Sequence, residues 1–359
     1  MRPISIAEVI AGIGPREQLS PGRLEAPPYT PPPEENRHRV MLAVSSMQKH
    51  TTDEGWQIAL ALEHAGYLLV GYGLPRNETD VGRIVRHLNP GVIVVQDKRE
   101  WDAQPRDFRD RRARFNRIDC LAQDKERFKL TILKDSQQRP HYHAESAQEI
   151  GCHAWIIYYH PRIVKHLAPY IREEHCIRTY HSLDPVHVPT YRSEGRAGCF
   201  LSGAVSNAYP LRQRLFRDAN RLPNCTVLHH PGYHQNGCHT PQYLEQLSRH
   251  RVAICTASRF GYALRKIIEA TAAGCIVLTD LPGDEVLPEI DDNLVRIHPE
   301  TPTEQIADLL SRLEASYDPQ RQRHFALRAT SYYDYHHLGT ILARDIEALR
   351  CRYNERSQS

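Results

Sequence analysis

The stretch that decides the fold is SRFGYALRKIIEATAAGCIVLTD, residues 258–280. Gly261 and Tyr262 open a predicted helix, and Gly274 ends it before the apolar strand predicted over residues 275–279. A helix joined by a glycine turn to a short apolar strand is typical of proteins in which the two elements alternate around a parallel sheet. The stretch therefore predicts an α/β domain.

The same stretch carries charged side chains that suit a nucleotide diphosphate. Arg265 and Lys266 fall in the first turns of the predicted helix, where the helix N-terminus and two cations together attract phosphate. Glu269 lies one turn beyond Arg265, and its carboxylate can accept two hydrogen bonds from a ribose diol. The alternative interpretation is that Arg265 and Glu269 form a solvent-exposed ion pair worth only about 0.3–0.5 kcal/mol.

A second stretch, CFLSGAVSNAYPLRQRLF at residues 199–216, predicts a short strand, a small-residue loop and a helix that begins near Pro210. Gly203 lies in the loop, and Arg212 and Arg214 lie in the first turns of the helix. Such a loop exposes backbone amides to an anion. The alternative is an ordinary connection between a strand and a helix.

Together the two stretches resemble the carboxy-terminal domain of GT-B glycosyltransferases, in particular the group 1 and family 4-like proteins. The resemblance rests on Glu269-Ala270, Ala273-Gly274 and Asp280-Leu-Pro282, and it covers residues 198–345. Many relatives carry a second glutamate at the position of Gly261, and this chain does not. The resemblance implies a nucleotide-sugar donor, with UDP-sugar as the expected co-substrate and neither a metal nor another cofactor. The sequence pattern and the resemblance together indicate these donor-binding residues: Gly203, Arg212, His230, Tyr262, Arg265, Lys266 and Glu269.

The chain is long enough for two domains at about 100–200 residues each. Clustered prolines mark residues 1–36 as a flexible arm. Residues 37–190 form the predicted acceptor domain, residues 191–335 the predicted donor domain, and residues 336–359 a terminal helix that returns to the first domain. The expected fold class is α/β, with two Rossmann-like doubly wound domains of GT-B type facing a cleft.

Apolar runs alternate with helical patterns along both predicted domains. The last two helical patterns cover residues 302–313 and 320–350. The predicted strands are residues 40–44, 67–70, 92–95, 130–133 and 154–158 in the first domain, and 199–201, 226–229, 252–255, 275–278 and 293–297 in the second.

Composition narrows the class of protein. The chain has 40% hydrophobic and 25% charged residues and a net charge of +3, as expected for a globular protein without a polyanionic partner. No run of about 18–20 apolar residues predicts a membrane span, and no secretory signal is recognisable, so a cytoplasmic location is expected. The nine cysteines include no Cys-x-x-Cys pair, which predicts reduced thiols rather than disulfides or a metal site.

Candidate proton acceptors follow strands of the first predicted domain. His50 and Asp53 lie in the loop after its first strand, and His143 follows the strand ending at residue 133. Asp53 is equally well interpreted as the N-cap of the next helix. The histidine-rich segment 229–239 fits no familiar zinc spacing, so no metal site is predicted.

The sequence thus predicts an enzyme, a hexosyltransferase-like glycosyltransferase that moves a sugar from a nucleoside diphosphate to an unidentified acceptor. The alternative is a catalytically silent module that binds sugar nucleotide or nucleic acid, or a transferase acting on nucleic acid. The alternative is suggested by residues 106–117, which contain six arginines and only two aspartates and could therefore bind the phosphates of nucleic acid. A solvated helix face is the favoured interpretation of this run, so nucleic acid is not the favoured partner. A nicotinamide-dependent oxidoreductase is disfavoured because no Gly-x-Gly-x-x-Gly turn follows a predicted strand.

Overall fold

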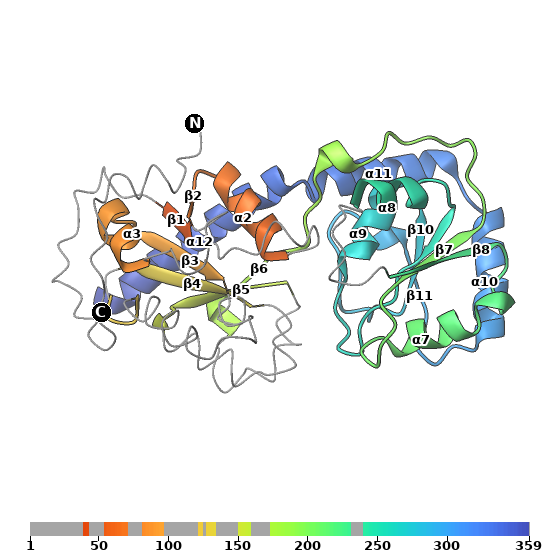
Figure 1. Cartoon of the computed structure of the whole chain (residues 1–359), viewed down its shortest axis with the longest axis horizontal. Helices are drawn as coiled ribbons and strands as arrows, with labels where there is room; N and C mark the ends of the chain where they lie inside the picture. The colour runs from red at the N-terminus through yellow and green to blue at the C-terminus, as the bar shows by residue number, and fades with distance from the viewer. Residues whose placement is uncertain are drawn as a thin grey trace. The chain divides into compact units, whose positions relative to one another are not determined.

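The structure is a computed structural model, and Figure 1 labels its helices and strands. The chain divides into two compact units. The first comprises residues 1–48, 53–179 and 339–359, and the second comprises residues 49–52 and 180–338. The predicted domain limits at residues 36, 190 and 335 stay predictions. The residues that the structure describes are 39–42, 54–70, 81–96, 121–124, 127–133, 150–158, 173–230 and 240–358.

The first unit contains a six-stranded sheet in the order β2-β1-β3-β4-β5-β6, in which every pairing is parallel. All six residues of β4 and all four of β5 are buried, as expected for central strands of a parallel sheet. The elements of this unit are β1 (Arg39–Leu42), α2 (Glu54–His64), β2 (Leu68–Val70), α3 (Val81–Leu88), β3 (Val92–Gln96), β4 (Phe128–Leu133), β5 (Ala154–Ile157) and β6 (Cys176–Arg178).

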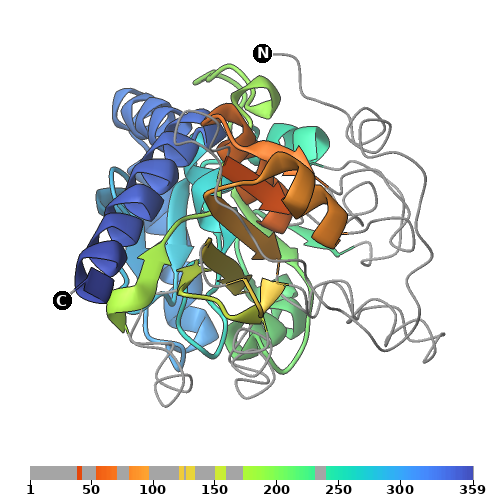
Figure 2. The same ribbon diagram turned by 90° about the vertical axis from the view of Figure 1, so that its left-hand side faces the viewer.

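Helix α12 (Tyr335–Gln358) supplies the last segment of the first unit from Gly339 onward. A β-carbon at Gly339 would clash with the carbonyl oxygen of Ala61, so α12 contacts the α2 backbone closely at this glycine. Farther along, the ring of Tyr353 meets His153 edge-on, with 4.7 Å between the ring centroids. In Figure 2 this helix runs toward the C-terminal mark beside the strands of the first unit.

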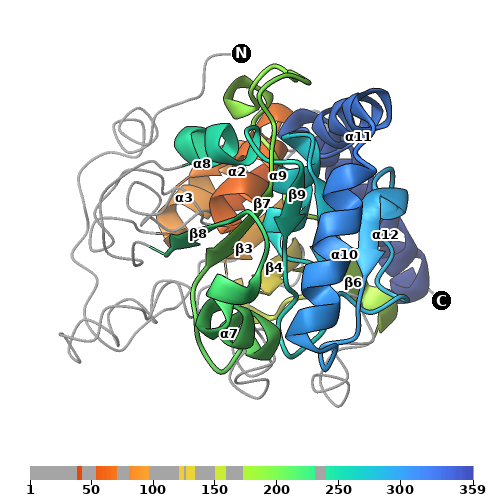
Figure 3. The same ribbon diagram turned by 90° about the vertical axis from the view of Figure 1, so that its right-hand side faces the viewer.

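The second unit contains a five-stranded parallel sheet in the order β11-β10-β9-β7-β8. The chain enters at β7, runs outward to β8 at one edge and then crosses back to β9 on the other side of β7. Figure 3 shows this unit from the side. Its elements are β7 (Cys199–Gly203), α7 (Pro210–Arg217), β8 (Cys225–His229), α8 (Thr240–Leu247), β9 (Val252–Ile254), α9 (Arg265–Ala272), β10 (Ile276–Thr279), β11 (Leu294–Arg296), α10 (Thr303–Ala315) and α11 (Pro319–Tyr332).

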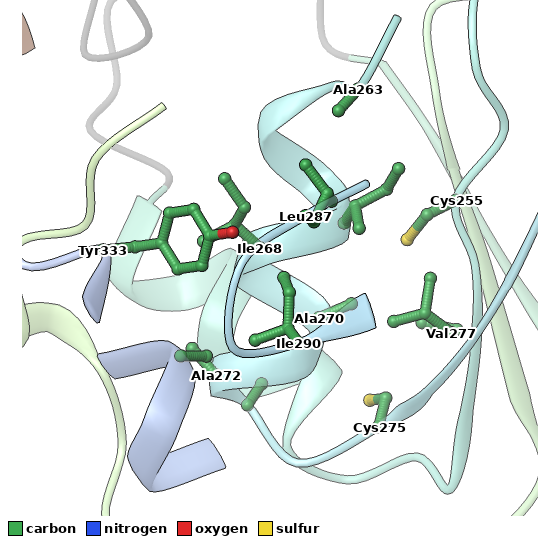
Figure 4. Packing of buried hydrophobic residues seen from close by; sticks show 14 of the residues in the cluster. Cys255, Ala263, Ile268, Ala270, Ala272, Cys275, Val277, Leu287, Ile290 and Tyr333 are labelled. Atoms are coloured by element: carbon green, nitrogen blue, oxygen red, sulfur yellow. The ribbon is translucent and has the colours of Figure 1, made fainter. Parts of the chain in front are cut away.

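Apolar side chains cover both faces of the second sheet. Along β7, Leu201 packs in one core cluster with α7 and α10, whereas its neighbour Phe200 packs in another with α8, α9 and α11. Alternate residues of a strand point to opposite faces, so β7, β9 and β10 each contribute to both clusters. Figure 4 shows the larger cluster, in which Ile268 and Ala270 of α9 pack with Val277 of β10. This packing holds α9 against the sheet.

Most predicted elements are confirmed, and two predictions about them were wrong or incomplete. All five strands predicted in the second domain are present, with small shifts at their ends. The pattern over residues 320–350 is not one helix but two, because Leu183 hydrogen-bonds to the backbone at the break. Its N–H donates to the Tyr333 carbonyl at 2.6 Å, and its carbonyl accepts from the Tyr335 N–H at 3.0 Å. Strand β6 was not predicted, because its three residues are too short an apolar run.

None of the helices in the described residues is both long enough and apolar enough to span a bilayer.

Candidate functional site

Two loops meet where the strand order of the second sheet reverses, between β7 and β9. Ligands of open parallel sheets bind at such a point, beyond the carboxyl ends of the strands. Gly203 ends β7 with a φ of +126°, a conformation that residues with a β-carbon rarely adopt, and the chain then passes through a loop into α7. The backbone N–H of Arg259, in the loop after β9, donates to the Ala208 carbonyl at 2.7 Å and joins the two loops.

Arg212, on the first turn of α7, links the same two loops through its side chain. Its Nε donates to Thr256 Oγ1 at 3.0 Å, its Nη2 to the Thr256 carbonyl at 3.2 Å and its Nη1 to the Ala204 carbonyl at 3.0 Å. The guanidinium also lies over the Tyr209 ring, 4.0 Å from the centroid. Arg212 is 3% exposed, so these contacts hold a buried cation in one orientation.

Lys266, on α9, brings a second cation to the same place. Its Nζ donates to Ser202 Oγ at 3.0 Å. A β-carbon built on Gly203 would lie 2.7 Å from Lys266 Nζ and 2.8 Å from Arg212 Nη1, so both cationic groups flank the α-carbon of this glycine. Burial, and then the charge of Arg212, lower the pKa of Lys266 to about 8. The arrangement concentrates positive charge where a phosphate would be neutralised.

Arg265 and Glu269 form an ion pair on α9, with 2.8 Å between Nε and Oε1. The side chains are 14% and 7% exposed, so the pair is largely buried and differs from the solvent-exposed pair considered as an alternative. Buried His181 lies close to Arg265. Burial and the positive charge of Arg265 lower the pKa of His181 to about 3, so this imidazole is neutral near pH 7.

Helix α9 begins later than predicted. It starts at Arg265, not at Gly261 or Tyr262, because residues 258–261 form a turn in which the Gly261 N–H donates to the Ser258 carbonyl at 2.8 Å. Gly261 has a φ of +67°, and a β-carbon there would lie 2.9 Å from Pro282 Cγ. A glutamate would be strained at this position, which gives a physical reason for the missing second glutamate of the resemblance.

The remaining predicted donor-binding residues are His230 and Tyr262. His230 follows β8, and after burial the largest causes of its lowered pKa are the charges of Lys266 and Arg212, so it lies near both cations. Tyr262 is 5% exposed and forms part of the buried loop rather than an open surface. Both side chains belong to the second unit.

The predicted proton acceptors His50, Asp53 and His143 lie outside the described residues, and so does the arginine-rich run at 106–117. The histidine-rich segment is described only at His229 and His230. Within the described part of the chain, no three histidine, cysteine or acidic side chains form a group that could hold a metal ion.

Four residues that organise the site, Ser202, Tyr243, Thr256 and Asp280, were not among the predicted site residues. Ser202 is the penultimate residue of β7 and Thr256 follows β9, and their places at the carboxyl ends of strands were the only signal in the sequence. Tyr243, on α8, hydrogen-bonds to Ser202 with 2.9 Å between the hydroxyls. Asp280, after β10, accepts the Ala257 N–H at 2.6 Å and so anchors the loop between β9 and α9. Their contacts join residues at least 23 positions apart, which no local pattern reveals.

No family model and no curated protein matches the sequence. Solved structures match by fold. Sucrose-phosphate synthase from Thermosynechococcus elongatus has a TM-score of 0.53 and 13% identity, over 88% of this chain and 100% of that chain. Anabaena HepE in complex with UDP and glucose has a TM-score of 0.53 and 14% identity, over 87% and 99%. An alpha-glucosyltransferase in complex with UDP-glucose and DNA containing an abasic site has a TM-score of 0.52 and 9% identity, over 88% and 99%. The chain has the fold of these glycosyltransferases, which confirms the predicted GT-B type of α/β fold.

Proposed function

We propose that the chain is a glycosyltransferase whose second unit binds the nucleoside diphosphate of a sugar donor. The observation that carries the proposal is the convergence of Arg212 and Lys266 on Gly203, at the strand-order reversal of the second sheet. Fold alone does not assign an activity, because one fold hosts many functions. The two cations supply the chemistry that a departing diphosphate requires.

Departure of the sugar leaves negative charge on the diphosphate, and catalysis requires groups that bind this charge more tightly as it develops. Arg212 is fixed by three hydrogen bonds and Lys266 by Ser202, so both cations are oriented before the donor arrives. Loss of one such preorganised donor typically slows turnover by about 10²–10³-fold. Because two side chains supply the positive charge, the proposed transfer is independent of a metal ion.

The other donor groups are assigned to neighbouring residues. Glu269 is proposed to accept hydrogen bonds from the ribose, with Arg265 holding its carboxylate in place. His230 and the residues that follow it in the sequence are proposed to contact the nucleobase, and Tyr262 to support the loop between β9 and α9. UDP is the nucleotide proposed, because UDP or UDP-glucose is named with two of the solved structures of the same fold.

The general base, which removes the proton from the hydroxyl group that receives the sugar, is proposed to be His50, Asp53 or His143. The acceptor is proposed to be a hydroxyl compound that binds the first unit. The DNA named with one structure of the same fold makes DNA one acceptor class to include in a screen.

Thermal shift with nucleotides tests the donor site. We expect UDP at about 100 times its dissociation constant to raise the melting temperature by about 5 °C or more, with or without EDTA. Arg212→Met should abolish the shift, whereas Arg249→Met should preserve it, because Arg249 is 59% exposed and lies in the turn after α8 with Glu245 as a surface partner. If no member of a UDP, GDP, ADP and CDP panel raises the melting temperature of the unmodified chain, the donor site is wrongly assigned.

Donor hydrolysis separates a transferase from a silent binding module. Water substitutes slowly for the acceptor in a transferase, so we expect the chain to release free glucose and UDP from UDP-glucose, and Lys266→Met to reduce that release by about 100-fold. Chromatography of the nucleotides measures the reaction. If UDP-glucose raises the melting temperature but is recovered intact, the chain is a binding module instead.

A further inference from the structure

Three side chains from different elements form a chain of contacts behind Gly203. Lys266 Nζ of α9 donates to Ser202 Oγ of β7 at 3.0 Å, and that oxygen lies 2.9 Å from the Tyr243 hydroxyl of α8. The Lys266 ammonium also lies 5.3 Å from the centroid of the Tyr243 ring. Ser202 is 4% exposed, so its hydroxyl is not simply solvated.

We propose that Ser202 and Tyr243 are positioning residues that hold the Lys266 ammonium beside Gly203 in its charged form, ready for the donor diphosphate. The inference rests on the proposed function, because it assumes that a diphosphate binds at this glycine. The lysine side chain is a flexible stem of four carbons. Without hydrogen-bond partners, the Lys266 ammonium would move away from the nearby Arg212 guanidinium, which carries the same charge. The hydroxyl acceptor and the face of the aromatic ring both favour a cation, and together they oppose that repulsion.

The charged and titratable groups around Lys266 decide whether a change of pH between 7 and 9 alters the charge of this lysine. Arg212 and Glu269 bear opposite charges near it, and the Arg212 guanidinium keeps its charge between pH 7 and 9. Burial raises the pKa of Cys255 to about 12 and that of Tyr243 well above its ordinary value, and the pKa of His230 is lowered. Lys266, with a pKa of about 8, therefore titrates between pH 7 and 9.

The sign of the expected effect follows from the binding of UDP to the protonated lysine. UDP is fully ionised above pH 7, since a terminal phosphate has a second pKa of about 6. UDP affinity of the unmodified chain should therefore be constant from pH 7 to about pH 8 and should fall by up to about tenfold per pH unit above it. Loss of the Ser202 hydroxyl removes a hydrogen bond to the Lys266 ammonium, which lowers the pKa of Lys266 further. The decline in affinity should then begin at a lower pH.

The test is the pH profile of UDP affinity, measured by calorimetry from pH 6 to 9 on the full chain. In Ser202→Ala the decline should begin about one pH unit earlier, so that affinity falls several-fold at pH 8 and little at pH 6. Tyr243→Phe should shift the profile in the same direction by a smaller amount. Ser202→Thr keeps the hydroxyl and should restore the original profile. Lys266→Arg should show no decline up to pH 9, because arginine stays protonated.

Each failure has its own signature. Absence of UDP binding by the unmodified chain at every pH contradicts the proposed function. UDP binding that is independent of pH from 7 to 9, or a Ser202→Ala profile lowered equally at every pH, contradicts the positioning role and leaves the donor site standing. Thermal melting without ligand identifies a variant that has failed to fold, and in that case the comparison of Tyr243→Phe with Lys266→Arg decides the proposal.

Discussion

Gly203→Ala is expected to weaken UDP binding by about 100-fold or more while leaving a folded protein. The new methyl would lie 2.7 Å from Lys266 Nζ and 2.8 Å from Arg212 Nη1, and both groups must move away from the phosphate position. Loss of even one or two charged hydrogen bonds, at about 1.5–3 kcal/mol each, accounts for that change in affinity. Because the methyl meets the ends of two side chains rather than the backbone, the effect on folding should be smaller than the effect on binding.

The free energy of unfolding should also fall, by about 1–3 kcal/mol, because alanine is strained at the φ of +126° that Gly203 adopts. Calorimetry with UDP and urea denaturation separate the two effects. Gly283→Ala is the matched control, because a β-carbon there meets no atom within 4 Å. Gly203→Ala binding UDP as tightly as the unmodified chain would show that no diphosphate contacts these cations.

The sequence was informative where function depends on neighbours along the chain. Runs of apolar residues predicted all five strands of the second sheet, of which the central strands β7, β9 and β10 are buried on both faces. Pro210 marked the start of α7 correctly, since proline is well suited to the first turn of a helix. The cations on α7 and α9 were predicted from their places near helix starts, although α9 begins at Arg265 rather than at the glycine turn.

The contacts that orient those cations were beyond sequence patterns. Thr256 accepts a hydrogen bond from Arg212 across 44 positions, and Ser202 accepts one from Lys266 across 64. Such pairs become visible only once the strand order places β7 beside β9. The division between α11 and α12 was missed for the same reason, because it depends on the distant backbone of Leu183. Periodicity predicts which residues are buried but does not identify the partners that they meet.

Glu269→Leu is expected to lower the free energy of unfolding by about 3 kcal/mol, the lower end of the range for breaking a buried ion pair. It leaves the Arg265 guanidinium largely buried without its carboxylate partner. The double variant Arg265→Met/Glu269→Leu should regain most of this loss, because well-packed apolar residues commonly replace a buried pair at little cost. The same replacement on an exposed pair, Glu245→Leu/Arg249→Met, serves as control and should change stability by less than about 1 kcal/mol. Urea denaturation of the variants measures each change.

The double variant also separates the two roles assigned to Glu269. If its carboxylate binds ribose, the double variant recovers stability but still binds UDP at least tenfold more weakly, since a lost hydrogen bond to a charged group costs about 1.5–3 kcal/mol. If Glu269 serves only to neutralise Arg265, stability and UDP affinity recover together. Recovery of both would remove Glu269 from the donor site and leave Arg212 and Lys266 in it, because the hydrogen bonds of those cations beside Gly203 go to Thr256, Ala204 and Ser202 rather than to the ion pair.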